Sequence, residues 1–106
     1  MAVSVIITRT IKDSSVLEKL SSLIVQLRSR AIVQPGYLNA QTFSCLDCEG
    51  EYLVISNWDT LEDWNRWINS EERLAIQNKV DALLGEKTVY RYYEPVVGGI
   101  APRFDK

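Results

Sequence analysis

The chain has 106 residues, of which 46% are hydrophobic and 25% are charged, and its formal net charge is −2. This size and composition predict one globular domain, and the scattered Lys and Arg residues lack the concentrated basic face that nucleic-acid binding requires. The sequence contains no histidine, so the commonest general base and the commonest metal and haem ligand are missing, and we expect neither metal nor cofactor. The apolar runs are shorter than a membrane span and the first residues lack the features of a signal peptide, so we expect a cytoplasmic protein.

The N-terminal segment "AVSVIITRTI" is rich in β-branched residues and predicts a strand over residues 2–11. Both of its sides are at least partly covered, with Val3, Val5, Ile7 and Ile11 on one and Ile6, Thr8 and Thr10 on the other. A helical period follows over 14–34, carried by Leu17, Leu20, Leu23, Ile24, Leu27 and Ala31. Ser15 and Glu18 fit a capping box at the helix start, and Pro35 and Gly36 end the helix.

Two further strands, "YLNAQTFSC" (37–45) and "EYLVISNW" (51–58), have the spacing of a hairpin. The first closes on the only cysteines, Cys45 and Cys48, in "CLDC". A redox-active pair at this spacing usually opens a helix, and a structural zinc site would need a second ligand pair. We therefore interpret the two cysteines as ordinary thiols at the end of a hairpin.

A second helical region is expected to begin at Thr60, whose hydroxyl can cap the amides beyond it, with Asp63 three residues on. Ser70 is a further capping candidate, so the helix is expected to break there and to restart. The restarted part carries Ile76, Val80, Leu83 and Leu84 and ends at Gly85. "KTVYRYYEP" (87–95) predicts the last strand. These elements place a domain over residues 1–95, followed by a Gly- and Pro-containing C-terminal tail over 96–106.

The predicted order is β-α-β-β-α-β, which indicates the α+β ferredoxin-like fold, a four-stranded antiparallel sheet with both helices on one face. We expect the other face to carry Val3, Val5 and the tyrosines Tyr90, Tyr92 and Tyr93. A chain of this length has no third layer to cover that face. A two-fold homodimer, with the sheets packed against each other, is the simplest cover.

The three tryptophans all lie in "NWDTLEDWNRWINSEER" (57–73). At 100° per residue, Leu61, Trp64 and Ile68 share one side of the helix, which predicts Trp64 as core, and Trp58 is expected to pack beneath it. Trp67 lies at the edge of that side, where a half-buried ring either walls a cleft or only covers surface. In the restarted helix, Gln77 lies at the edge. Arg73 falls on its apolar side, where it is either solvated, paired, or in contact with an anion.

From Val3 to Glu94 the sequence resembles the antibiotic biosynthesis monooxygenase (ABM) superfamily. The likeness is carried by "PGYLNAQTF", "EYLVISNWDTLEDWNRWINSEER" and "VYRYYEP". They are similar to the family's Pro-Gly-aromatic entry to the second strand, its third-strand Trp before a short helix, and its helix ending in a Ser. The resemblance implies a ferredoxin-like protomer that pairs into a dimeric α/β barrel.

The haem-degrading branch of that superfamily has a Trp three residues before this Ser, which matches Trp67 and Ser70. The branch's haem-ligating His corresponds to Gln77, and its first-strand Asn to Thr8. With two of its three haem-site residues replaced, the chain is not expected to degrade haem, and histidine-dependent activities are disfavoured for the same reason.

The remaining resemblance is to the cofactor-independent oxygenases of polyketide pathways, which oxidise anthrone-like phenols to quinones. This resemblance implies a monooxygenase that acts on a small aromatic substrate, quinol- or anthrone-like, in a cleft between sheet and helices. In this hypothesis the rings of Trp64 and Trp67 wall the pocket, hydrogen bonds come from its polar groups, and an arginine balances the developing phenolate. The candidate polar residues are Thr8, Tyr37, Asn57, Gln77, Arg73 and Arg91.

Two other functions stay open. The same dimeric cleft can hold a small aromatic or hydrophobic ligand without turning it over, because a fold does not determine a function. Alternatively, the chain is a stress-related or sensor protein whose dimer surface is the functional part.

Overall fold

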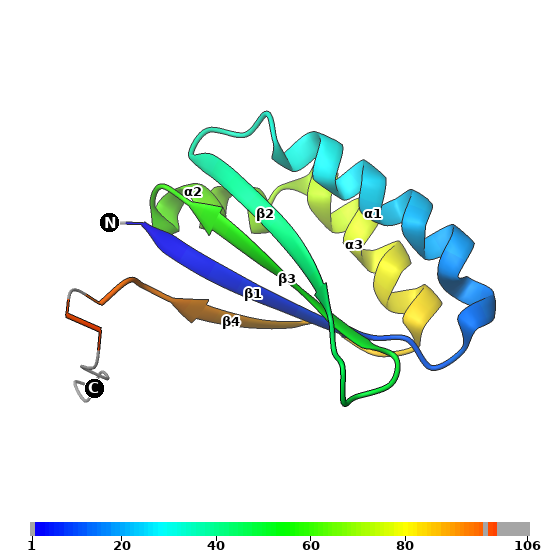
Figure 1. The fold of residues 1–106 in the computed structure, drawn as a ribbon. Helices are drawn as coiled ribbons and strands as arrows, with labels where there is room; N and C mark the ends of the chain where they lie inside the picture. Colours follow the sequence, from blue (N-terminus) through cyan, green and yellow to red (C-terminus); the bar gives the residue numbers. More distant parts are fainter. Residues whose placement is uncertain (1, 97, 100–106) are drawn as a thin grey trace.

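The computed structural model describes residues 2–96 and 98–99. A four-stranded antiparallel sheet, in the order β2-β3-β1-β4, carries its helices on one face (Figure 1). The elements in chain order are β1 (Val3–Thr10), the 3₁₀ turn η1 (Ser14–Val16), α1 (Leu17–Ala31), β2 (Tyr37–Ser44), β3 (Glu51–Trp58), α2 (Leu61–Ile68), α3 (Glu71–Leu84) and β4 (Val89–Tyr93). The predicted ferredoxin-like α+β fold is confirmed. None of the helices in the described ranges is long and apolar enough to cross a membrane.

Strand β1 divides its side chains between the two faces of the sheet. Val3, Val5, Ile7 and Arg9 are all buried, and the residues between them are partly exposed. Because successive side chains of a strand point to opposite faces, these four lie under the helices. The prediction that Val3 and Val5 face away from the helices was therefore wrong. Alternation shows which residues share a face, but not which face the helices cover.

The register of β4 against β1 places the tyrosines in the same way. Tyr90 pairs with Ile7 and Tyr92 with Val5, so both side chains lie on the helix face. The Tyr92 hydroxyl accepts a hydrogen bond from Trp64 Nε1 at 3.3 Å. Of the three tyrosines, Tyr93 belongs to the opposite face, because it pairs with Ser4.

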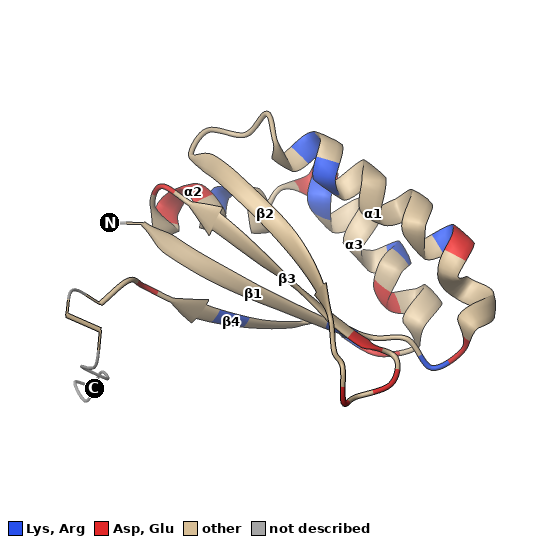
Figure 2. Cartoon of the chain, in the orientation of Figure 1, with Lys and Arg blue, Asp and Glu red and all other residues tan. Residues whose placement is uncertain are grey.

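We call the sheet face away from the helices the open face. Its apolar side chains, given by the strand register, are Ile6, Phe43, Leu53, Ile55, Val89 and Tyr93. Charged residues lie mainly on the helices and loops, and the sheet is nearly free of them (Figure 2). Arg91 and Glu51 are the charged residues that the register places on the open face of the described strands, and a broad, largely apolar surface of this kind is typical of a face that another protein surface covers.

The helix ends follow local chemistry. Thr60 accepts a hydrogen bond from the amide of Asp63 at 3.0 Å, Ser70 accepts one from Arg73 N at 3.2 Å, and Gly85 ends α3 with a left-handed φ of 75°. These three predicted ends are confirmed. The predicted capping box at Ser15 was wrong, because the Asp13 carboxylate binds the Ser15 amide one turn earlier and a 3₁₀ turn precedes α1.

Tryptophan side chains form the middle of the core at the end of the sheet near α2. Trp58 is fully buried, and its ring makes edge contacts with Tyr37 and Trp64 at centroid distances of 5.5 and 5.7 Å. Its Nε1 donates to Ser56 Oγ at 2.8 Å, so the buried polar atom is satisfied. The prediction that Trp58 packs beneath Trp64 is confirmed.

Gly50 ends the β2–β3 turn where two backbone segments touch. Its φ is +85°, and an added Cβ would lie 2.2 Å from the carbonyl oxygen of Ile11. We expect Gly50→Ala to lower the free energy of unfolding by about 3 kcal/mol, from left-handed strain and from the clash together. Gly85→Ala is the matched control, because its φ is also positive but nothing lies within 4 Å. It should cost about 1 kcal/mol in the same urea titration. Equal losses would contradict the role of the close approach.

Candidate functional site: a cavity between helices and sheet

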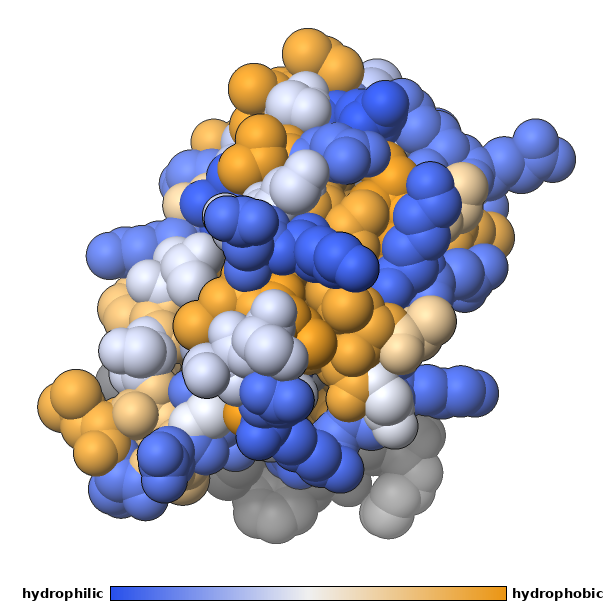
Figure 3. All heavy atoms as spheres, turned by 90° about the vertical axis from the view of Figure 1, so that its right-hand side faces the viewer, coloured by the Kyte–Doolittle hydropathy of each residue, from blue (hydrophilic) through white to orange (hydrophobic). Residues whose placement is uncertain are grey.

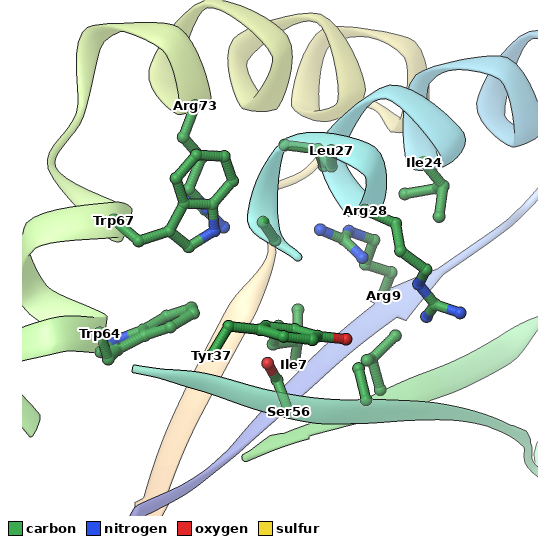
Figure 4. A pocket seen from close by; sticks show the side chains of 13 residues that line it. Ile7, Arg9, Ile24, Leu27, Arg28, Tyr37, Ser56, Trp64, Trp67 and Arg73 are labelled. Atoms are coloured by element: carbon green, nitrogen blue, oxygen red, sulfur yellow. The ribbon is translucent and has the colours of Figure 1, made fainter. Parts of the chain in front are cut away.

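A cavity lies between the helices and the helix face of the sheet, near the junction of α2 and α3 (Figure 4). Its volume is about 60 Å³, several times the roughly 10–15 Å³ that one water molecule needs. It is lined by Ile7, Arg9, Ile24, Leu27, Arg28, Ala31, Tyr37, Ala40, Val54, Ser56, Trp64, Trp67 and Arg73. Most of these side chains are apolar or aromatic, which is the usual composition of a small-molecule site. On the side of the molecule that lies at the right in Figure 1, hydrophobic side chains are visible between hydrophilic ones (Figure 3).

The short helix α2 supplies the aromatic wall. Trp64 and Trp67 are 1% and 4% exposed and both line the cavity. Leu61, which we expected on the buried side with Trp64, is 45% exposed. The buried side of α2 is therefore centred between Trp64 and Trp67. The half-burial expected for Trp67 was wrong, because its ring belongs to the hydrophobic core and lies on the buried side of α2 together with Trp64.

Arg73 stands in the first turn of α3, where the Ser70 cap begins the helix. It is 3% exposed, and its guanidinium carbon lies 5.6 Å from the centre of the Trp64 ring and 5.3 Å from that of Tyr90. Its Nη2 donates to the Tyr90 hydroxyl and to Gln77 Oε1, the latter at 3.2 Å. The helix start and the two rings therefore hold the cation inside the protein.

Arg9 is a second buried cation that our sequence analysis missed. It is 5% exposed and projects from β1 into the same cavity lining. Its Nη2 donates to Gln77 Oε1 at 3.1 Å and its Nε to Thr88 Oγ1 at 3.3 Å. The sequence held a signal for it. The alternation that puts Ile7 in the core puts Arg9 there too, and an arginine is seldom buried unless it is paired with another group.

Gln77 joins the two arginines through one oxygen. Its amide nitrogen donates to Asp81 Oδ1 and to Thr88 Oγ1, both at 2.8 Å. A carboxylate can only accept, so the amide nitrogen must face Asp81, and the Gln77 carbonyl oxygen must face Arg9 and Arg73. Gln77 does not itself line the cavity, but it fixes the two cations that do.

The charged residues that line the cavity are all cationic. Three arginines line it and none of its lining residues is an Asp or Glu. The ion pairs recorded among the described residues involve Lys12, Arg30 and Arg66, not Arg9 or Arg73. Two guanidinium nitrogens that share one oxygen are at most about 6 Å apart, where two unit charges repel by about 3 kcal/mol at an effective dielectric constant of 20.

Three of the candidate residues lie elsewhere. The side chains of Thr8, Asn57 and Arg91 are on the open face, because they alternate with helix-face residues in β1, β3 and β4. Asn57 there accepts from Ser4 Oγ and donates to Asn39 Oδ1. The structure thus brings Tyr37, Trp64, Trp67 and Arg73 together around the cavity, with Gln77 behind them, and separates the other three from it by the thickness of the sheet.

The cysteines lie at the far end of the β2–β3 hairpin, and neither Cys45 nor Cys48 forms a disulfide. Hydrogen bonds to the Cys48 thiol and to the Asp47 side chain raise the pKa of Cys45 to about 11, so this thiol is a poor nucleophile at neutral pH. The ligand atoms of Cys45, Cys48 and Glu51 lie within 4.8 Å of one another. Three ligands at a largely exposed hairpin do not complete the four-ligand shell of a structural zinc site.

Comparison with known families decides where the chain belongs. The family model described as "Antibiotic biosynthesis monooxygenase" matches residues 2–79. The chain belongs to the ABM family. This match includes β1 to β3, α2 and most of α3, and with them every residue that lines the cavity. No curated protein matches the sequence significantly.

Solved structures share the ABM fold at low sequence identity. A conserved protein from Methanosarcina mazei Go1 is 14% identical, with a TM-score of 0.78 over 88% of this chain and 91% of that one. SnoaB, a cofactor-independent oxygenase from Streptomyces nogalater, is 15% identical, with a TM-score of 0.76 over 90% and 93%. Rv0793 from Mycobacterium tuberculosis is 16% identical, with a TM-score of 0.76 over 91% and 96%. Identities this low show the fold alone.

Proposed function

We propose that the protein is a cofactor-independent monooxygenase that oxidises a small phenolic substrate, quinol- or anthrone-like, in the cavity between sheet and helices. Membership of the ABM family and the fold shared with SnoaB support the reaction class. The observation that carries the proposal is the cavity itself, where aromatic walls from Trp64, Trp67 and Tyr37 enclose the buried cation of Arg73. Such a site binds a ring and stabilises negative charge on it.

The chemistry needs little from the protein. A phenol loses its proton more easily beside Arg73 and Arg9, because nearby positive charge favours the anion and lowers the pKa of a bound phenol. The electron-rich anion reduces dioxygen, and the two combine to a peroxide at the oxidised carbon. Loss of water then leaves a carbonyl, so that a CH₂ group and O₂ become C=O and H₂O. Exclusion of water from the cavity while the substrate is bound would keep the intermediates from reacting with water.

Haem does not fit this cavity. Gln77 stands where the resemblance places the haem-ligating residue of the haem-degrading branch. Its carbonyl oxygen accepts from Arg9 and Arg73, and its nitrogen donates to Asp81 and Thr88. The side chain has no group left to act as an axial ligand.

The proposal includes a homodimer through the open face. The apolar open face of the sheet and the ABM family support it. Such pairing would bury Ile6, Ile55 and Tyr93 and would form a barrel from two sheets. The predicted division into a domain over 1–95 and a tail from Val96 belongs to the same proposal; most of the tail lies outside the described residues.

A binding protein without catalysis is the second candidate. The observation that favours it is the absence of any carboxylate among the cavity-lining residues of the described chain, in a sequence that also has no imidazole. A proton from the substrate must therefore leave through a hydroxyl, such as that of Tyr37 or Ser56, or through water.

Oxygen uptake with anthrone and with substituted hydroquinones tests the proposal. We expect consumption of one O₂ per quinone formed, and a drop in kcat/KM of about a hundredfold in Trp67→Ala, because the ring positions the substrate. Trp67→Phe keeps an aromatic wall and should lose less than tenfold on the same scale. Aromatic ligands that quench tryptophan fluorescence without any oxygen uptake would establish the binding protein instead.

A further inference from the structure

We propose that the ligand of this cavity carries a carboxylate, which Arg9 and Arg73 bind together, so that the substrate class is a small aromatic acid. The inference rests on the proposed function, because it concerns the same cavity. Under this inference the ligand carries a negative charge before the reaction starts, whereas the phenolate of the proposed function forms only during the reaction.

The first argument is the surplus of hydrogen-bond donors. A guanidinium has five N–H groups, and the recorded bonds use Nε and Nη2 of Arg9 and only Nη2 of Arg73. Nη1 of Arg9, and Nε and Nη1 of Arg73, have no hydrogen-bond partner within the described residues. None of them is among the fully enclosed atoms without a partner, which in the described chain are limited to the Tyr52 hydroxyl. Since both residues line the cavity, their free N–H groups have access to it.

The second argument is charge. Burying a cation without a counterion is costly, and here two lie side by side around the neutral oxygen of Gln77. The carboxylate in this hydrogen-bond network, that of Asp81, accepts from Gln77 and Thr88 and forms no ion pair with either arginine. An anion that enters the cavity therefore meets two cations that form no ion pair with any carboxylate of the described residues.

The third argument is shape. Guanidinium groups bind a planar carboxylate through pairs of parallel hydrogen bonds, which a neutral group cannot match. The rings of Trp64, Trp67 and Tyr37 lie beside the arginines and face the same space (Figure 4).

Paired ligands test this inference without any need for turnover. We would measure the affinity of the wild-type protein for benzoate and 4-hydroxybenzoate, and for the corresponding neutral amides, by calorimetry. Each acid should bind at least about tenfold more tightly than its amide, as expected for hydrogen bonds to a charged group. Each acid should also raise the melting temperature more than its amide does.

Substitutions then assign the preference to the two arginines. Arg9→Gln and Arg73→Gln should each reduce the preference for the acid to less than about threefold while the circular dichroism spectrum is retained. Arg66→Gln is the matched control, because this arginine is exposed on α2 and should leave the preference unchanged.

Equal binding of acid and amide by the wild-type protein would overturn the inference, and this comparison needs no variant to fold. A preference that persists in both glutamine variants, or that disappears in Arg66→Gln, would overturn it too.

Oxygen uptake separates this result from the proposed function. Oxidation of neutral phenols without a preference for acids removes the carboxylate site alone, whereas tight binding of acids without oxygen uptake removes the monooxygenase alone.

Discussion

Replacing Trp58 with alanine is expected to lower the free energy of unfolding by about 4 kcal/mol. The side chain at the end of β3 is fully buried, and its ring makes one edge contact with Tyr37 and another with Trp64. Its removal leaves a cavity, and it also deprives Ser56 Oγ of its donor. Domains of this size have a total stability of about 5–15 kcal/mol, so the variant should be close to unfolding at 37 °C. Chemical denaturation monitored by circular dichroism measures the loss.

Leu61→Ala is the control for that experiment. Leu61 is also hydrophobic and lies three residues from Trp64 in the same region, but it is 45% exposed. Its loss should cost less than about 1 kcal/mol. A cost for Leu61→Ala similar to that for Trp58→Ala would mean that α2 packs on the side that the sequence pattern first suggested.

Replacing Ile55 with lysine is expected to convert a dimer into monomers. Ile55 lies on the open face in the central strand β3, where it pairs with Ile6 on one side and Gln41 on the other. In a two-fold dimer the substitution puts two ammonium groups into one apolar interface. The cost of several kcal/mol for desolvating them raises the dissociation constant by about a thousandfold or more. Light scattering coupled to size-exclusion chromatography should give twice the chain mass for the wild type and the chain mass for the variant.

Leu46→Lys controls for the added charge, because Leu46 is fully exposed at the tip of the hairpin. This variant should remain dimeric. A wild-type protein that is monomeric at micromolar concentration would contradict the dimer proposal directly, and so would an Ile55→Lys variant that keeps the dimer mass.

The features that the sequence predicted well depend on neighbours in the chain. Ser70 interrupts the helix because its own hydroxyl binds an amide three residues on, and Gly85 ends α3 because it adopts a left-handed conformation. The hairpin and the element order follow from periodicity for the same reason. The cap expected from Ser15 is instead made by Asp13, whose carboxylate accepts a hydrogen bond from the Ser15 amide. Two polar residues in one short segment compete for the same amides.

The sequence did not predict which sides of β1 and α2 are buried, because packing between elements that are distant in the chain determines this. Both sides of β1 carry β-branched residues, so its alternation could not show that Val5 faces the helices. In α2 the position of the hydrophobic side was inferred from Leu61, yet the contacts of Trp67 with the rest of the core turned that side away from Leu61.

The candidate site was predictable in part. The helical positions of Trp64, Trp67 and Arg73 predicted them on or beside the apolar sides of their helices, and all three line the cavity. Asn57 was predicted as a hydrogen-bonding group at the edge of the cleft, but it lies on the open face. Arg9 could have been found, because it continues the pattern of buried residues in β1.

The neutrality of Gln77 has a consequence for the electrical character of the protein interior. An amide oxygen can bind two guanidinium groups with the geometry of a carboxylate but without its charge. A glutamate at this position would act as a built-in counterion and cancel much of the local potential. With a neutral glutamine, the two guanidinium groups keep their charge, so under the carboxylate proposal the cavity would favour an ionised ligand over its neutral form.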